Sequence, residues 1–157
     1  MDNKSDILRE VLIQIEKEKH SLQESIDRCK NEIEEAPGPM VSHSDTTRHQ
    51  VGQQLMNLTE HLEKLESAEK FMRESSCDHK DGILSVGCIA EIEVDGKNRF
   101  VFIVPNGVGG ITVGTNTKIS IISELSPMSQ AILGKKIGDD SSFKVNGLEK
   151  QIKILNI

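Results

Sequence analysis

The chain has 157 residues with a formal net charge of −6 at pH 7, and only 3% of its residues are aromatic. Residues 1–76 hold 16 acidic and 10 basic side chains, whereas residues 77–157 hold 9 of each, so the excess negative charge lies in the first half. This distribution argues against a general nucleic-acid-binding protein, because neutralising phosphates requires a basic surface.

The N-terminal residues and the hydropathy pattern predict a cytoplasmic protein. The start, MDNKSDILRE, lacks the basic region and apolar run of a signal peptide. No apolar run approaches the roughly 20 residues needed to span a bilayer. Cys29, Cys77 and Cys88 have no C-x-x-C spacing, so we expect thiols in a reducing compartment instead of a disulfide framework or a zinc site.

Residues 1–76 predict two long amphipathic helices. Their apolar residues recur at alternating spacings of three and four, which is typical of coiled-coil packing. In the first helix, which Lys19 interrupts, these residues are Leu12, Ile15, Leu22, Ile26, Cys29 and Ile33. In the second, which Glu69 interrupts, they are Val51, Leu55, Leu58, Leu62, Leu65 and Met72. A stripe this narrow needs a partner helix.

The segment between the two helices favours an antiparallel hairpin. Pro37, Gly38 and Pro39 prevent one continuous helix. The nearest partner for each helix is then the other one, folded back into a rod of about 45 Å. The rival arrangement is a linker between helices that each pair with another chain. We expect the hairpin to occupy residues 1–76, with its tip near residues 36–46.

From about residue 80 the hydrophobic period changes to two, which predicts a small antiparallel sheet over residues 80–157. Strands are expected at 86–94, 99–105, 110–114, 118–123, 141–145 and 150–157. Residues 95–98, DGKN, predict a hairpin turn, and the glycine-rich residues 106–110 predict a flexible hairpin connection, not a phosphate-binding loop. Ser126 and Pro127 predict the start of a short helix, and Gly134 predicts its end.

Residues 126–145, SPMSQAILGKKIGDDSSFKV, resemble the C-terminal domain of GreA/GreB-type bacterial transcription elongation factors. That family typically reads S-P-apolar-x-x-A-apolar-apolar-G-K-K-apolar-G-D here, and Ser126, Pro127 and residues 131–139 match it. Residues 86–104, VGCIAEIEVDGKNRFVFIV, are similar to the family's opening hairpin. The resemblance implies an α+β fold, with an N-terminal antiparallel coiled-coil hairpin followed by a small FKBP-like antiparallel β domain that carries one short helix.

The resemblance also implies a function: a transcription elongation factor that is not itself an enzyme and whose partner is bacterial RNA polymerase. The β domain would dock at the rim of the polymerase's secondary channel through Glu124, Ser126, Pro127 and Met128. The hairpin would enter the channel, where its tip acids would help to hold Mg²⁺, so that the polymerase cleaves backtracked RNA. The chain would need no cofactor of its own, meet nucleic acid only within the elongation complex, bind no membrane and act as a monomer.

The tip departs from the family pattern. Cleavage-active relatives usually carry an Asp and a Glu three residues apart, whereas here Asp45 is followed three residues later by Arg48. Asp45 is the candidate Mg²⁺ ligand, because its carboxylate supplies the oxygen that this ion prefers. Glu34 and Glu35 are the nearest further acids, and they could join Asp45 only if the loop folds back tightly.

Alternatives remain for both the site and the function. Asp45 could serve only as the N-cap of the second helix, with Thr47 and Gln50 as a capping box. Leu125 stands where the family often has Asp or Asn, which leaves its effect on docking open. The chain could then be a channel-binding modulator or inhibitor without cleavage activity, or a coiled-coil adaptor for another protein.

Overall fold

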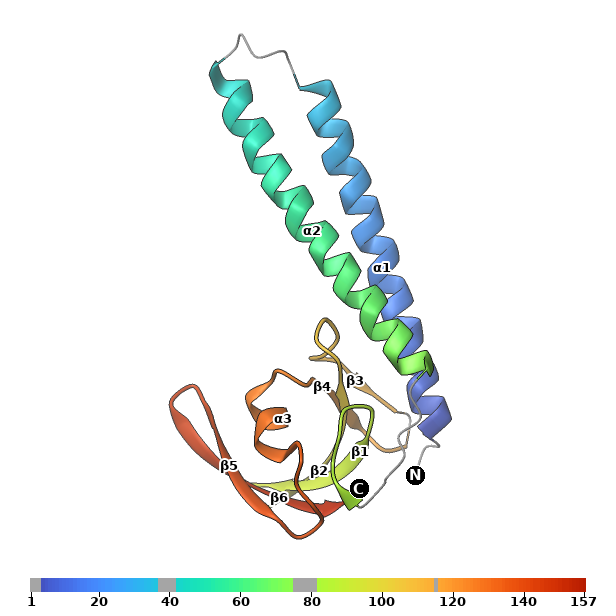
Figure 1. Cartoon of the computed structure of the whole chain (residues 1–157), viewed down its shortest axis with the longest axis vertical. Helices are drawn as coiled ribbons and strands as arrows, with labels where there is room; N and C mark the ends of the chain where they lie inside the picture. Colours follow the sequence, from blue (N-terminus) through green and yellow to red (C-terminus); the bar gives the residue numbers. More distant parts are fainter. Residues whose placement is uncertain (1–3, 37–41, 75–81, 115) are drawn as a thin grey trace.

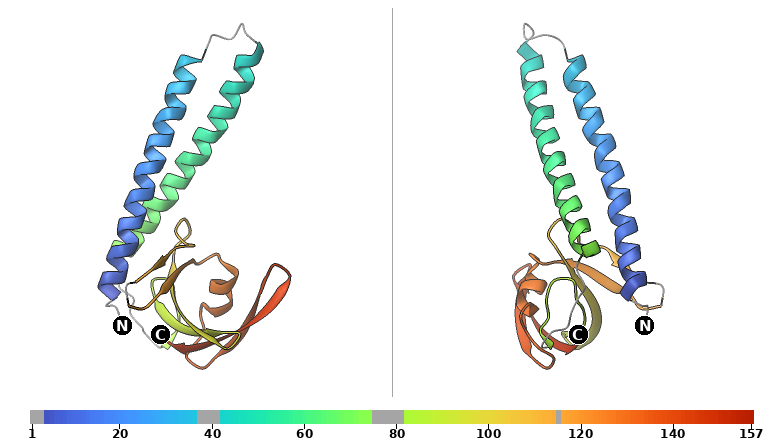
Figure 2. Two further views of the ribbon diagram at one scale, coloured as in Figure 1. Left: turned by 180° about the vertical axis from the view of Figure 1, so that it is seen from behind. Right: turned by 45° about the vertical axis from the view of Figure 1, so that its right-hand side comes forward.

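The computed structural model describes residues 4–36, 42–74, 82–114 and 116–157, and for residues 42–45 it describes the backbone alone. Two long helices, α1 (Lys4–Glu35) and α2 (Ser42–Glu74), lie side by side and extend away from a sheet domain (Figure 1). Figure 2 shows the same pairing from two further directions. The prediction of an intramolecular antiparallel hairpin is therefore confirmed. Within the described segments, no helix is long and apolar enough to cross a membrane.

The buried residues of the hairpin agree in part with the two predicted apolar stripes, because Ile7, Val11 and Ala68 were not among the predicted residues. In α1 they are Ile7, Val11, Ile15, Leu22, Ile26 and Cys29. In α2 they are Val51, Leu65, Ala68 and Met72. At about 1.5 Å per residue, the 32 residues of α1 make a rod of about 48 Å.

The two residues that interrupt the stripes, Lys19 and Glu69, meet across the hairpin. Lys19 Nζ donates to Glu69 Oε2 at 2.8 Å, and Arg73 Nη2 donates to Glu69 Oε1 at 2.7 Å. Hydrogen bonds from Lys19 and then Arg73 lower the pKa of Glu69, and the bond to Glu69 raises the pKa of Lys19. Because only one alignment of the helices pairs these charges, the contact favours a single register.

Six strands form one sheet in the order β3-β4-β2-β1-β6-β5. They are β1 (Ile89–Val94), β2 (Lys97–Val104), β3 (Thr112–Val113), β4 (Ile119–Ser123), β5 (Asp140–Val145) and β6 (Leu148–Asn156). The short helix α3 (Pro127–Ile132) follows β4. The α+β architecture, a helical hairpin followed by a sheet domain with one short helix, is confirmed. The sheet is not purely antiparallel as predicted, because β2 and β4 run parallel.

Tight turns close two of the antiparallel hairpins of the sheet, β1–β2 and β5–β6. Asp95 and Gly96 join β1 to β2 with φ of 49° and 76°, which confirms the predicted turn. Asn146 and Gly147 join β5 to β6 with φ of 51° and 79°. Positive φ at both central residues matches the right-handed twist of the flanking strands, and Asn, Asp and Gly tolerate it best.

One of the three cysteines differs from the prediction. Cys29 is a free cysteine and is buried in α1. Cys88 is disulfide-bonded, so the expectation of three free thiols is wrong for this residue. Cys77 lies outside the described residues.

An apolar cluster lies on each face of the sheet. One cluster joins Phe102, Val104, Ile119 and Ile121 of the sheet to the base of the hairpin, where it includes Ile7, Val11, Ile15, Leu65, Ala68 and Met72. The other lies under α3 and includes Ile92, Ile103, Ile132, Phe143 and Ile152. The hairpin base therefore covers one face of the sheet. The predicted division of the chain into a hairpin of residues 1–76 and a sheet domain of residues 80–157 stays a prediction.

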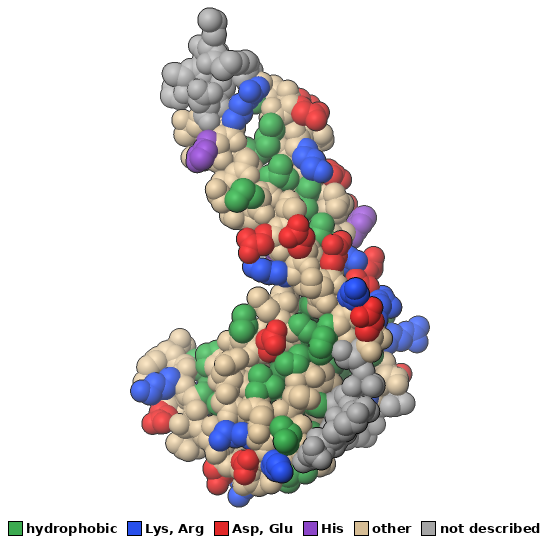
Figure 3. All heavy atoms as spheres, viewed as in Figure 1, with side chains coloured by type: hydrophobic (Ala, Val, Ile, Leu, Met, Phe, Trp, Pro, Cys, Tyr) green, Lys and Arg blue, Asp and Glu red, His purple; other side chains and the backbone are tan. Residues whose placement is uncertain are grey.

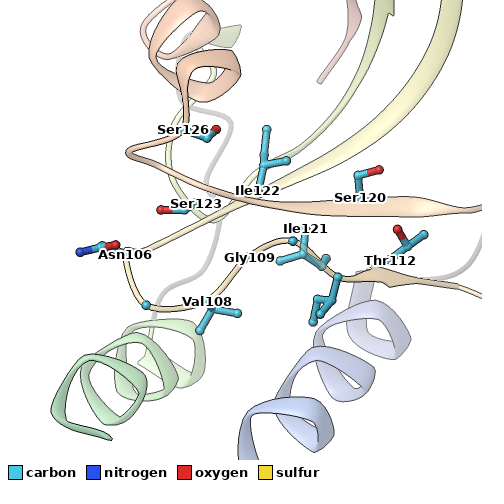
Figure 4. A pocket seen from close by; sticks show the side chains of 12 residues that line it. Asn106, Val108, Gly109, Thr112, Ser120, Ile121, Ile122, Ser123 and Ser126 are labelled. Carbon is cyan, nitrogen blue, oxygen red and sulfur yellow. The ribbon is translucent and has the colours of Figure 1, made fainter. Parts of the chain in front are cut away.

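The loop of residues 105–111 fastens the sheet to the hairpin. Val108 is 5% exposed, belongs to the shared cluster and points toward the two helices in Figure 4. Gly107 has φ +107°, and a Cβ there would lie 2.9 Å from Lys64 Cβ and 3.0 Å from the Lys64 carbonyl carbon. The prediction of a flexible hairpin connection is wrong, because this loop packs its backbone on α2 and leads to β3. The chain then returns beside β2 as β4, which makes that pair parallel.

We expect Glu69→Gln to lower the free energy of unfolding by about 0.5–1 kcal/mol near pH 7, the usual size for a partly screened ion pair. Because the pKa of Glu69 is lowered in the folded state, its contribution is present above the unfolded pKa and is lost as the pH falls through the folded pKa. The gap between wild type and variant, measured by urea unfolding, should therefore shrink below the ordinary carboxyl pKa of 4.5. Glu66→Gln, on the exposed part of α2, is the control. A loss that is independent of pH would contradict the role given to this charge.

We expect Gly107→Ala to lower the free energy of unfolding by about 2–4 kcal/mol, since it adds overpacking to the strain of a left-handed backbone. Gly110→Ala is the matched control, because Gly110 has φ +76° in the same loop but nothing lies within 4 Å of an added Cβ. Gly110→Ala should lower the free energy of unfolding by about 1–2 kcal/mol, which is the cost of the left-handed backbone alone. Equal losses of unfolding free energy in the two variants, measured by thermal or urea unfolding, would show that the close approach of residue 107 to Lys64 does not contribute.

Candidate functional site

The hairpin tip lies between the end of α1 at Glu35 and the start of α2 at Ser42. The backbone of Asp45 is in the first turn of α2, at the far end of the rod from the sheet domain (Figure 1). Because the helix starts at Ser42, the predictions that Asp45 is its N-cap and that Thr47 and Gln50 form a capping box are wrong. The side chain of Asp45 lies outside the described part of the chain.

Glu34 and Glu35 occupy the last turn of α1, and both are exposed. They belong to the end of the rod that carries Asp45. Their predicted approach to Asp45 depends on side chains outside the described part of the chain, so it stays a prediction. Within the described residues, no group of three or more His, Cys, Asp or Glu side chains is arranged to hold a metal ion.

Arg48 links the ends of the two helices. Its Nη2 donates to the backbone carbonyl of Ala36 at 2.7 Å, directly beyond the end of α1. Since α1 has no basic residue in its own last turn, Arg48 supplies the cation that complements the negative end of the helix dipole. Its Nε is buried and has no hydrogen-bond partner among the described residues. The position three residues after Asp45 therefore holds a cation that is tied to α1.

The predicted docking residues gather at the start of α3. Ser126 is the N-cap, as predicted, since its Oγ accepts a hydrogen bond from Ser129 N at 3.2 Å. Pro127 follows at the first helical position, where its missing N–H costs nothing. Pro127 is exposed, whereas Met128 is half-buried against the cluster under α3. The structure thus presents the proline ring to solvent next to a rigid cap.

Glu124 and Leu125 extend this surface on the other side of Ser126. The half-buried Glu124 accepts a hydrogen bond from Asn106 N through Oε1 at 3.1 Å, which ties the loop after β2 to the start of α3. Leu125 is 61% exposed, so an apolar side chain stands beside Pro127 on the surface. Asn106 was not identified from the sequence as part of this surface. Its only signal in the sequence is its place at the start of the NGVGG segment.

The turn after α3 has a structural explanation in the chain itself. Gly134 and Gly138 adopt φ of 78° and 91°, which is the left-handed region that favours glycine. Between them, the backbone N–H of Lys136 donates to Asp139 Oδ2 at 2.9 Å. Gly134, Lys136, Gly138 and Asp139 therefore shape a turn, and they need no ligand to account for their residue types.

A hollow of about 590 Å³ lies beside the docking residues. It is bounded by the loop of residues 106–112, by residues 120–123 of β4 and by Ser126, as Figure 4 shows. Its lining consists of hydroxyl, amide, backbone and aliphatic groups and contains no charged side chain. The hollow offers hydrogen bonds and apolar contacts, and its chemistry does not resemble a metal or phosphate site.

Three comparisons bear on identity. The family model described as "Transcription elongation factor, GreA/GreB, C-term" matches residues 79–157. No curated protein sequence matches the chain. Several solved structures match the chain at TM-scores below 0.5.

A structure of the transcription factor Gfh1 is 21% identical, with a TM-score of 0.41, and the match covers 96% of this chain and 92% of that one. Gfh1 of Thermus aquaticus is 23% identical, with a TM-score of 0.39 and coverage of 94% and 90%. The GreA/GreB factor of Nitrosomonas europaea is 18% identical, with a TM-score of 0.37 and coverage of 66% and 90%.

The family model carries the assignment by itself, because residues 79–157 make up half of the 157-residue chain. The matched region contains β1 to β6 and α3, together with the Ser126–Pro127 cap and the turn after α3. The chain belongs to the GreA/GreB family of transcription elongation factors.

Proposed function

We propose that the protein binds bacterial RNA polymerase in the cytoplasm, as a monomer, with its hairpin inside the polymerase's secondary channel. The observation that carries this proposal is the match of residues 79–157 to the GreA/GreB C-terminal domain. The shape supports it, because a rod of about 48 Å extends away from that domain and places its tip far from the docking residues (Figure 1).

Docking uses the surface at the start of α3. Pro127 and Leu125 present apolar groups to solvent, and Glu124 places a carboxylate beside them. The Ser126 cap and the hydrogen bond from Asn106 to Glu124 hold this surface in one conformation. Met128 supports it from below through the cluster under α3. A preorganised surface binds with less loss of conformational entropy.

At the tip, Asp45 promotes cleavage of backtracked RNA by the polymerase. The first turn of α2 carries this acid to the end of the rod. A carboxylate oxygen is the ligand type that Mg²⁺ prefers. A Mg²⁺ ion that the polymerase holds with its own ligands would stabilise the charge that develops during phosphodiester hydrolysis. Glu34 and Glu35, exposed at the end of α1, are the further acids of this end.

A second candidate is a channel-bound modulator that does not stimulate cleavage, and Arg48 favours it. The guanidinium lies one helical turn after Asp45 and is held by the Ala36 carbonyl. A cation three residues after an acid on a helix competes with a metal ion for that carboxylate. In this version the rod occupies the channel and changes the rate of elongation without supplying a metal ligand.

We expect Asp45→Ala to reduce cleavage of a backtracked transcript by at least about tenfold at limiting Mg²⁺, because it removes the tip carboxylate. The measurement is single-turnover cleavage on an assembled elongation complex with saturating factor. Glu32→Ala is the matched control, since Glu32 is an exposed acid near the same end of α1 that is not part of the proposed site. Unchanged cleavage in Asp45→Ala would contradict the role of this acid. A wild-type chain that alters elongation but stimulates no cleavage would favour the second candidate.

We expect Pro127→Glu to weaken binding to core polymerase by about tenfold or more, because it replaces an exposed apolar ring at the centre of the docking surface. The fold should persist, since an acidic residue is favourable in the first turn of a helix. Leu148→Glu is the control, because Leu148 is a 68% exposed apolar residue at the start of β6 and is not part of the docking surface. Equal affinities of the two variants would contradict this docking surface. If the wild-type chain itself does not bind polymerase, the adaptor alternative is favoured.

A further inference from the structure

A groove runs along the side of α2 that faces the sheet domain, and we call it the α2 groove. Two adjoining hollows of about 470 and 430 Å³ form it, and they share Glu60 and Glu63. One continues toward the tip past Gly52 and Met56, and the other reaches Phe71 and Glu124 at the sheet domain. In Figure 3 the surface is visibly hollowed where the hairpin meets the sheet domain, with acidic side chains above the hollow.

Much of the groove is lined by short side chains. Gly52, Thr59, Ser67 and Ala68 contribute short side chains between its taller walls. An apolar side chain stands near each end, Met56 at 67% exposure and Phe71 at 36%. Short residues between taller ones on a helix face are the surface into which the ridge of another helix packs. Apart from Leu55 of the apolar stripe and the buried Ala68, the lining residues lie outside the stripe of α2 that pairs with α1.

The charges of the groove are mostly negative. Glu60 and Glu63 line it from α2, and Glu124 lines it from the sheet domain. Lys64 is the one basic residue in its lining, and its Nζ donates to Glu60 at 2.7 Å. Three carboxylates and one ammonium leave a net of two negative charges along the groove. A nucleic acid is therefore repelled, and so is a second copy of this acidic hairpin.

We propose that the α2 groove binds a basic helical segment of a protein partner, and this rests on the proposed function, in which the partner is the polymerase. Met56 and Phe71 are fifteen residues apart, which is about 22 Å along the helix. A partner helix of similar length would place apolar residues against Met56 and Phe71 and basic residues against the three carboxylates. Contact along this face would add to docking at α3 and hold the rod in one direction inside the channel.

The test compares two charge reversals on one helix. Glu63 lines the groove, whereas Glu66 is equally an exposed glutamate of α2 but lies outside the lining. We expect Glu63→Lys to weaken binding of the full-length chain to core polymerase by about tenfold and to reduce the salt dependence of binding. Glu66→Lys should change the affinity by less than about twofold, since an exposed charge away from an interface contributes little. Thermal unfolding of both variants checks that the fold is kept.

The outcomes separate this inference from the proposed function. If the wild-type chain binds polymerase and the two reversals behave alike, the groove proposal is wrong and the polymerase proposal stands. If the wild-type chain does not bind polymerase, both fail. A photoreactive residue in place of Ser67 gives a second readout, because Ser67 lines the groove and is exposed. A crosslinked polymerase peptide rich in Lys and Arg supports the groove, and a crosslink to an acidic or neutral peptide overturns it.

Discussion

The fold depends on one shared apolar cluster, in which the base of the hairpin covers a face of the sheet. Phe102, Val104, Ile119 and Ile121 belong to that face, and each is at most 2% exposed. Burying such side chains contributes about 1.5–3 kcal/mol each, so their exposure in a sheet domain without helices would be costly. In a chain with no Trp or Tyr, the helices supply burial that aromatic residues provide in other small domains. The direction of the rod is thus set by the core itself.

A shared core also explains why the loop of residues 105–111 is built as it is. Val108 must enter the cluster between α1 and α2, and this brings the backbone at Gly107 against Lys64. Any side chain at 107 would hold the sheet away from the helix. The same loop carries Asn106, which donates to Glu124 beside α3. One segment therefore connects the hairpin, the sheet and the surface proposed for docking, so a change in the packing of the hairpin base would be felt at that surface.

Local patterns in the sequence predicted the elements well. The spacing of Leu22, Ile26 and Cys29 predicted the helical stripe, and the Asp95–Gly96 pair predicted a turn whose positive φ few other residues tolerate. The contacts between distant segments were not predictable in this way. Lys19 and Glu69 were visible as two separate interruptions, and only the alignment of the helices makes them partners. The parallel pairing of β2 with β4 likewise depends on the path of a loop over α2.

The tip shows why the sequence identified a departure without explaining it. Arg48 was recognisable as a replacement for an acid, but its role follows from two helix ends that local signals placed imprecisely. Once α1 ends at Glu35 without a basic residue in its last turn, a cation from α2 is the group that can satisfy the Ala36 carbonyl. An acid at position 48 would instead place negative charge against that carbonyl. In this hairpin, position 48 therefore closes the tip with a cation, and an acid at that position would lose the contact with the Ala36 carbonyl.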